Sequence, residues 1–227
     1  MTTIASNLQA MRTAIKAAAA GAGRHADDVS LLAVSKTFAQ AAVRDACQAG
    51  QTRFAESYVQ EALKKITALQ DLPIEWHFIG PVQSNKTRAI AEHFAWVHSV
   101  DRLTIAERLS AQRPAHLPPL QVCLQVNISG EDSKSGVSPD QLSALARAVA
   151  KLPGLKLRGL MAIPAPVDDV AAQRLPFAQL RELLDRLNQQ GLNLDTLSMG
   201  MSHDFSAAIA EGATMVRIGS AIFGQRE

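Results

Sequence analysis

Apolar positions recur along this chain with two different spacings, and the chain changes repeatedly from one spacing to the other. At the start, Ile4, Leu8, Met11 and Ile15 are separated by three or four residues, which predicts an amphipathic helix over residues 1–20. Short apolar runs bounded by polar or turn-forming residues come next, and such runs predict strands. The predicted strands are residues 30–35, 52–55, 76–79, 96–99, 120–128, 155–163, 196–199 and 215–218.

Each predicted strand except the last leads into a segment with helical spacing. Gly50 is expected to end one helix, Pro139 to open another at its first position, and Pro176 to bend a long one. Ser84 and Asp101 are predicted helix caps. The predicted helices are residues 39–49, 58–69, 84–94, 102–111, 138–152, 171–190 and 203–210, with a short terminal turn at 221–223.

Strict alternation of strand and helix indicates an α/β fold with a parallel sheet and helical crossovers. Eight such units in about 200 residues fit a (β/α)8 barrel, the TIM-barrel fold, near its lower size limit. An open, doubly wound sheet is the alternative, but no G-x-G-x-x-G motif follows the first strand, which weakens its dinucleotide-binding form. Because no long linker rich in Gly, Ser or Pro divides the chain, we expect residues 1–227 to form a single domain.

Composition and charge exclude several classes of protein. The net charge is +2 and there is no strong basic block, so the chain lacks the electrostatic footprint of a nucleic-acid-binding protein. Cys47 and Cys123 form neither a metal-binding spacing nor a disulfide framework, and we expect buried structural thiols. The sequence has no apolar run of about 18 residues and no signal-peptide pattern. We therefore expect a cytoplasmic protein that does not enter a membrane.

Candidate chemistry begins at Lys36, which closes the strand-like run that starts at Ser30. Burial penalises an ammonium group, so a lysine at the end of a buried strand is unusual. A lysine whose pKa is lowered can attack a carbonyl carbon and form a Schiff base. The alternative is a lysine whose stem packs on the strand while its charged end reaches water. Active sites of such barrels lie at the carboxyl ends of the strands, where Lys36 is expected to stand.

The loops after the seventh and eighth predicted strands carry features of a phosphate site. Gly200 and Ser202 follow one strand, and Gly219 and Ser220 follow the other. Glycine allows close backbone approach and a helix start supplies free N–H groups, although Ser202 as an ordinary N-cap is the alternative. The first and eighth strands are neighbours in a closed barrel, so a phosphorylated carbonyl compound can bridge these loops and Lys36. Pyridoxal 5′-phosphate (PLP) fits, since one ring carries both an aldehyde and a phosphate.

Arg217 and Gly219 are two residues apart, so they lie on the same face of the strand and can face the same pocket. An arginine in that place can donate a hydrogen bond to the nitrogen of a pyridine ring. Because a guanidinium stays protonated, the ring nitrogen would remain unprotonated and the ring would be a poor electron sink. This disfavours transaminase-like chemistry. A structural ion pair near the rim is the alternative for Arg217.

Seven stretches, in order along nearly the whole chain, resemble the YggS/PROSC family of pyridoxal phosphate homeostasis proteins. They are residues 31–37 (LLAVSKT), 58–61 (YVQE), 76–86 (WHFIGPVQSNK), 133–136 (SKSG), 158–164 (RGLMAIP), 197–202 (LSMGMS) and 216–224 (VRIGSAIFG). The resemblance implies one barrel like the N-terminal domain of fold-type III PLP enzymes such as alanine racemase, preceded by the N-terminal helix.

The resemblance also implies roles for individual residues. It implies a Schiff base between PLP and Lys36, and a pocket wall that includes Met161 at the end of the sixth strand. The remaining implied contacts are to the phosphate from Ser202, Gly219 and Ser220, and to the ring nitrogen from Arg217. Family members are described as binding and supplying the cofactor without established turnover. Apo forms of PLP-dependent enzymes are possible transient partners.

Two positions depart from the family's pattern. Ser57 stands where the family commonly has an asparagine that would contact the ring region. Serine is shorter, so a water molecule would have to bridge this contact. Ser220 stands where the family often has threonine, and because the hydroxyl is kept, phosphate binding should survive.

A small PLP-dependent racemase or lyase is the main alternative, and a cofactor-free Schiff-base aldolase is a third. A racemase of this fold needs a second acid–base group opposite the lysine. The single tyrosine of this chain, Tyr58, follows the second strand, where we expect it to serve packing. No residues are left for a second domain, which favours a cofactor carrier, and we expect a monomer.

Other polar residues have mainly structural interpretations. We expect His77 to be a core histidine with satisfied hydrogen bonds and His203 to face solvent. Asn85 and Lys86 begin a helix near the barrel mouth, where they either hold an anion or simply meet water. Lys134 lies in a polar loop from which we expect it to approach the mouth and accept the cofactor in transfer.

Overall fold

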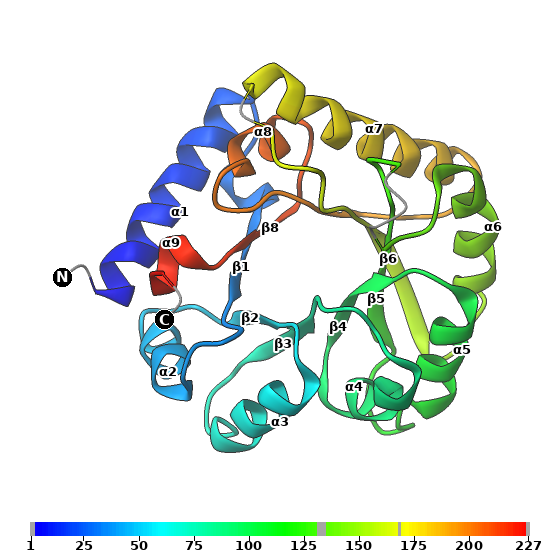
Figure 1. Ribbon diagram of the computed structural model, residues 1–227, viewed down its shortest axis with the longest axis horizontal. Helices are drawn as coiled ribbons and strands as arrows, with labels where there is room; N and C mark the ends of the chain where they lie inside the picture. The colour runs from blue at the N-terminus through cyan, green and yellow to red at the C-terminus, as the bar shows by residue number, and fades with distance from the viewer. Residues whose placement is uncertain (1–2, 131–134, 168, 226–227) are drawn as a thin grey trace.

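The predicted strands form a closed parallel barrel, which confirms the TIM-barrel prediction and shows that the open sheet is wrong. The computed structural model describes residues 3–130, 135–167 and 169–225. The strands pair in chain order and the last pairs back onto the first (Figure 1). Within the described residues they are β1 (Ser30–Val34), β2 (Arg53–Glu56), β3 (Glu75–Phe78), β4 (Trp96–Val100), β5 (Leu120–Gln125), β6 (Leu155–Met161), β7 (Thr196–Ser198) and β8 (Met215–Ile218).

Helices surround the barrel (Figure 1). The N-terminal helix α1 (Ile4–Gly21) lies outside the barrel against α2, α8 and α9. The other α-helices are α2 (Gln40–Gln48), α3 (Val59–Ala68), α4 (Thr87–His93), α5 (Leu103–Gln112), α6 (Pro139–Val149), α7 (Val170–Gln189), α8 (Phe205–Ala210) and α9 (Ser220–Phe223), with 3-10 turns η1 (Ala26–Asp28) and η2 (Ser84–Lys86). None of the helices within the described ranges is long and apolar enough to cross a membrane.

Alternation of side chains along each strand separates two regions of the core. On β8, Val216 and Ile218 belong to the large apolar core between strands and helices. Met215 lies on the other side of the same strand and packs inside the barrel with residues of β1 and β2. Since successive strand residues point to opposite faces, Arg217 shares the inner face with Met215. Arg217 therefore lies inside the barrel, as its strand parity predicted.

Several predicted boundaries are wrong by a few residues. Asp101 does not cap α5, because its carboxylate pairs with Nη1 of Arg102 at 2.7 Å and Arg102 is the residue that precedes the helix. Ser84 opens the 3-10 turn η2 instead of capping a helix. The fifth strand ends at Gln125 instead of reaching residue 128, because Val126 forms an isolated bridge with Val137. These differences follow from local pairings that apolar periodicity does not encode.

Candidate functional site

A cavity of about 420 Å³ opens at the carboxyl ends of the strands, where the fold predicts an active site. It collects every predicted site residue except Met161. Its lining is Val34, Lys36, Ser57, Ile79, Ile163, Met201, Ser202, His203, Arg217, Gly219, Ser220 and Gln225. These residues come from the ends of β1, β2, β3, β6, β7 and β8, so the cavity is assembled by barrel closure.

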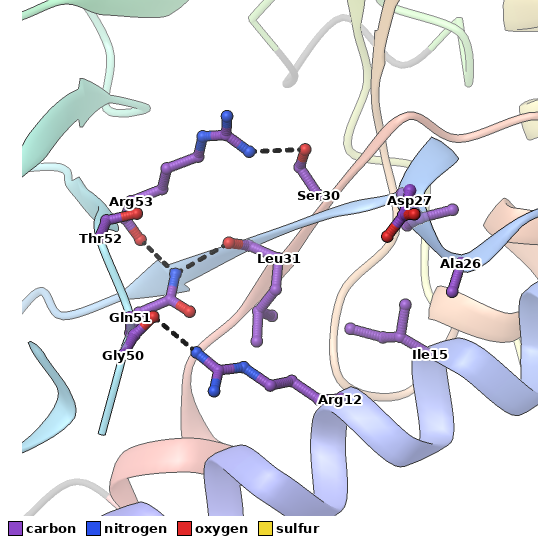
Figure 2. Close-up of a pocket in the computed structure, with 11 residues that line it drawn as sticks. Arg12, Ile15, Ala26, Asp27, Ser30, Leu31, Gly50, Gln51, Thr52 and Arg53 are labelled. Atoms are coloured by element: carbon purple, nitrogen blue, oxygen red, sulfur yellow. Dashed lines mark hydrogen bonds between the residues drawn. The ribbon is translucent and has the colours of Figure 1, made fainter.

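A second cavity of about 310 Å³ lies at the opposite ends of β1 and β2, beneath α1 (Figure 2). Two of its polar side chains donate to backbone carbonyls. Arg12 Nη2 donates to the carbonyl of Gly50 at 2.8 Å, and Gln51 Nε2 donates to the carbonyl of Leu31 at 2.9 Å. The first bond attaches α1 to the loop before β2, and the second attaches that loop to β1, so we assign this cavity a structural role.

Lys36 stands two residues beyond the end of β1 and is half-buried at the wall of the site cavity. The next residue, Thr37, has a φ of 72°. This left-handed conformation is unfavourable for a β-branched residue and persists only where the surroundings enforce it. The enforcing contact is a hydrogen bond of 2.6 Å from the Thr37 N–H to Oε1 of Glu61. The chain around Lys36 is therefore bent sharply and held from α3.

A buried charge cluster supports this bend from below. Lys65 Nζ donates to Oε1 of Glu56 at 2.8 Å, to Oε1 of Glu61 at 2.7 Å and to the carbonyl of Ser35 at 2.7 Å. The Ser35 hydroxyl donates to the same oxygen of Glu56 at 2.6 Å. Glu56 is 0 % exposed and Lys65 5 % exposed. Burial raises the pKa of Glu56, and the hydrogen bonds from Lys65 and Ser35 oppose that rise.

This cluster was not among the features predicted from the sequence. Glu61 and Lys65 are four residues apart on one helix, and oppositely charged residues at this spacing form ion pairs. This spacing was the one signal in the sequence that could have indicated part of the cluster. Glu56 comes from β2, and only the packing of α3 on the barrel shows that it joins them.

Arg217 lies inside the barrel with its guanidinium below the cavity, and its side chain is held by three hydrogen bonds. Nη1 donates to the carbonyl and to Oγ of Ser198 at 2.5 and 2.9 Å, and Nη2 donates to the carbonyl of Ala162 at 2.9 Å. Burial lowers the pKa of Arg217 to about 10, so the group keeps its charge at neutral pH. The alternative of an ion pair at the rim is wrong, because these partners are carbonyl and hydroxyl groups.

The loop after β7 turns toward the cavity at a glycine with positive φ, a conformation that glycine adopts without strain. Gly200 has a φ of 92°, and a Cβ placed there would lie 2.6 Å from the Cβ of Ala208. Its carbonyl accepts a hydrogen bond of 2.9 Å from the N–H of Arg217, which joins the two loops predicted to bind phosphate. Ser202 lines the cavity but does not begin a helix, since α8 starts at Phe205. The expectation that a helix begins at Ser202 is therefore wrong, and so is the alternative of Ser202 as an N-cap.

The loop after β8 completes this side of the cavity. Gly219 precedes α9 and Ser220 is its first residue, with an exposed side chain. A Cβ at Gly219 would lie 3.3 Å from the carbonyl oxygen of Val34, so β1 leaves little room for a larger residue. The hydroxyls of Ser202 and Ser220 and the side chain of Lys36 thus border one space, as the strand order required.

Met161 does not line the cavity. Its side chain is 0 % exposed and packs with Trp96 and Cys123 inside the barrel. β6 ends at Met161, and the residue two positions further, Ile163, reaches the cavity and is 41 % exposed. The lining role that the resemblance implied for Met161 is therefore wrong, because the strand ends while this side chain is still packed inside the barrel. Ile163 and Ile79 are lining residues that the sequence analysis missed.

The remaining sequence predictions have mixed outcomes. Tyr58 is 57 % exposed, so the packing role predicted for it is wrong; it precedes α3 in an extended conformation. His77 is buried with both ring nitrogens hydrogen-bonded, as predicted. His203 is exposed, as predicted, and also lines the cavity. Lys86 lies in η2 and is not part of the cavity lining that the structure describes. Lys134 lies outside the described residues.

Comparison with known proteins agrees with this geometry. The family model of the alanine racemase N-terminal domain matches residues 6–227. A pyridoxal phosphate homeostasis protein of Pseudomonas aeruginosa is 64 % identical over 227 residues, covering 100 % of this chain and 97 % of the relative. The Escherichia coli protein of that name is 54 % identical, covering 100 % and 98 %.

A solved structure is similar along its whole length. PipY of Synechococcus elongatus with PLP bound, a member of the COG0325 family, has a TM-score of 0.86 and 39 % identity, covering 98 % of this chain and 100 % of that one. The match to the family model and the full-length curated relatives lead to one conclusion. This chain belongs to the alanine racemase N-terminal domain family and, within it, to the pyridoxal phosphate homeostasis proteins.

Proposed function

We propose that this protein binds PLP at the carboxyl end of its barrel, with the cofactor held on Lys36, and that it serves PLP homeostasis instead of catalysing a reaction. One observation carries the proposal: a single cavity is bordered by Lys36, by Arg217 and by the hydroxyls of Ser202 and Ser220. The PLP-bound structure of PipY, a full-length structural neighbour, supports it.

The residues present fit the cofactor. The cavity of about 420 Å³ lies within the range of small-ligand pockets, roughly 300–1,000 Å³. The Lys36 amine would attack the aldehyde carbon; a C=N bond replaces the C=O bond, and one water molecule leaves. The hydroxyls of Ser202 and Ser220 would donate to phosphate oxygens. Three N–H groups of Arg217 are used by Ser198 and Ala162, which leaves two of its five for the ring nitrogen.

The cavity wall favours storage of the cofactor over racemisation. When bound, PLP supplies an electrophilic carbon that amines can reach, and the protein must protect it for catalysis or expose it for exchange. Tyr58 is not part of the described lining, and its side chain is 57 % exposed. His203 does line the cavity, but its imidazole is 47 % exposed and lies 3.3 Å from Asp204. A well-shielded base opposite Lys36 is thus not part of the described wall.

Absorption spectroscopy tests the covalent attachment. Protein supplied with excess PLP is expected to develop the absorption band of a Schiff base, and Lys36→Ala is expected to lose it. Lys64→Ala, which changes an exposed lysine of α3, is the matched control and should keep the band. Absence of the band in the unaltered protein would overturn the proposal, as would its full retention in Lys36→Ala.

Loss of the phosphate hydroxyls is expected to weaken PLP binding. Ser202→Ala and Ser220→Ala should each raise the Kd by about 10- to 100-fold, because a hydrogen bond to a charged group contributes about 1.5–3 kcal/mol. Ser220→Thr keeps the hydroxyl and should bind nearly as the unaltered protein does. A titration followed by absorbance measures each Kd, with Ser143→Ala on α6 as a control. Equal Kd values for the alanine variants and the control would contradict this assignment.

Isotope exchange at the α-carbon of amino acids separates the carrier from a racemase or lyase. We expect no exchange at enzyme-like rates in the PLP-loaded protein. Transfer of the cofactor to apo-enzymes, the monomeric state and the cytoplasmic location stay predictions.

A further inference from the structure

A row of hydrogen bonds crosses the barrel interior from the site cavity to the opposite mouth. Arg217 Nη1 lies 2.9 Å from Ser198 Oγ, which lies 2.7 Å from His98 Nδ1. His98 Nε2 lies 2.9 Å from His77 Nδ1, and His77 Nε2 lies 3.0 Å from Oε1 of Glu75. The five residues belong to β8, β7, β4 and β3, so barrel closure alone assembles the row.

The two ends of this row lie in different cavities. Arg217 lines the proposed PLP cavity, whereas Glu75 lines a cavity of about 350 Å³ at the amino ends of the strands. His77, His98 and Ser198 are 0 % exposed, and the Glu75 side chain is 37 % exposed. The row therefore joins a solvent-accessible carboxylate to the guanidinium beneath the cofactor site.

The chemistry of the two ends determines the direction of every bond between them. A guanidinium only donates and a carboxylate only accepts, while a neutral imidazole has one donor and one acceptor. His77 Nε2–H must then donate to Glu75, which leaves its Nδ1 as the acceptor for His98 Nε2–H. His98 Nδ1 accepts from the Ser198 hydroxyl, whose oxygen accepts from Arg217. All four bonds are satisfied in this one arrangement, with both histidines protonated at Nε2.

The surroundings keep both histidines neutral. Burial lowers the pKa of His77 and lowers that of His98 well below its usual value. Arg53 lies near His77, and Arg217 lies near His98; both charges act in the same direction as burial, while Glu75 opposes them at His77. Trp96 stacks on His77 with ring centroids 5.4 Å apart and restrains the ring. A second proton on His77 would set its Nδ1–H against Nε2–H of His98, and a second proton on His98 would set its Nδ1–H against the hydrogen of the Ser198 hydroxyl.

We propose that Ser198, His98 and His77 form a directed hydrogen-bond chain, anchored at Glu75, that positions Arg217. The chain holds the oxygen of Ser198 as an acceptor for Nη1, so the remaining N–H groups of Arg217 keep one orientation toward the cavity. Its role toward a bound ring rests on the proposed function, whereas the protonation pattern of the histidines does not.

Nuclear magnetic resonance of 15N-labelled protein without PLP tests the direction of the chain. We expect both His77 and His98 to show a protonated Nε2 and an unprotonated Nδ1 at neutral pH. The exposed end allows a mild perturbation: Glu75→Ala should produce a mixture of tautomers at His77, while Glu75→Gln keeps an acceptor oxygen and the native pattern. A protonated Nδ1 on either histidine of the unaltered protein overturns the proposal, and so does an unchanged pattern in Glu75→Ala.

Ser198→Ala tests the effect on Arg217, because it removes the hydroxyl and leaves the backbone carbonyl that Arg217 also uses. We expect about tenfold weaker PLP binding and a shift of the 15N resonance of labelled PLP's ring nitrogen toward the protonated form. Thr196→Val is the matched control, since Thr196 is buried on the same strand and its hydroxyl donates to Asp195 instead. If Ser198→Ala matches the control in both measurements, the positioning role is wrong.

The measurements separate this inference from the proposed function. An unaltered protein that fails to bind PLP removes the function, while the tautomer experiment still decides whether the directed chain exists. If the unaltered protein binds PLP and Ser198→Ala leaves the 15N resonance of the ring nitrogen unchanged, only the positioning role is wrong.

Discussion

Lys65→Met is expected to lower the free energy of unfolding by about 3–5 kcal/mol, because it leaves a buried carboxylate without its partner. Lys65 is 5 % exposed, and its ammonium group contacts Glu56, which is 0 % exposed, at 2.8 Å. Glu61 is more accessible, with a side chain 30 % exposed, so solvent screens its share of the loss. Since whole domains are stable by about 5–15 kcal/mol, this one change removes a large fraction of the total.

The buried position, and not the loss of a positive charge, should account for this effect. Lys64→Met alters the exposed neighbour on α3 and is expected to change the free energy of unfolding by less than about 0.5 kcal/mol. Adding Glu56→Gln to Lys65→Met removes the stranded charge and should recover part of the stability. Urea unfolding of the variants measures each difference. Similar losses for Lys64→Met and Lys65→Met would show that the cluster does not stabilise the fold.

The same cluster should matter for PLP beyond stability. Lys65 and Glu61 hold the carbonyl of Ser35 and the N–H of Thr37, the residues on either side of Lys36. Loss of these bonds releases the left-handed conformation at Thr37, which is unfavourable on its own. Lys65→Met that remains folded is therefore expected to form the Schiff base more slowly than Lys64→Met.

Acidification from pH 7 to 5.5 is expected to destabilise the protein through its buried histidines. Their folded pKa values lie below the unfolded value of about 6.5, so the unfolded chain binds more protons than the folded protein in this window. The free energy of unfolding therefore decreases as the pH is lowered. One histidine that stays neutral when folded lowers the free energy of unfolding by about 1.3 kcal/mol between pH 7 and 5.5, and two histidines lower it by at most about 2.5 kcal/mol. The larger share belongs to His98, because Glu75 partly favours a proton on His77.

Two carboxylates with shifted pKa values also contribute to the pH dependence. Glu75 has a lowered pKa, so its contribution is lost only at more acidic pH, while the raised pKa of Glu56 acts in the opposite sense. Urea unfolding at several pH values measures the slope. His98→Asn should reduce the slope by about one proton, and His93→Asn, which changes an exposed histidine, should leave it unchanged. A slope that His98→Asn does not alter would mean that His98 is protonated in the folded protein.

Much of the cavity was predictable because strand order and strand ends determine what a barrel mouth contains. Lys36, Ser202, Arg217 and the pair Gly219–Ser220 follow recognisable strands, and closure makes the first and eighth strands neighbours. Met161, which the resemblance implied, is the exception: it is buried inside the barrel, and Ile163, two residues further along the chain, lines the cavity instead. Apolar periodicity is weak at strand ends, where side chains leave the core.

The sequence by itself determined the barrel, its strand order and most residues at its mouth, since alternation of strands and helices allows few closed arrangements. The tertiary structure alone decided which buried polar groups meet. Glu56 and Lys65 are joined by the packing of a helix on a strand. His77, His98, Ser198 and Arg217 meet because closure and stagger of the strands bring distant residues to the same level. No pattern along one chain specifies that level, because it depends on the register of all neighbouring strands together.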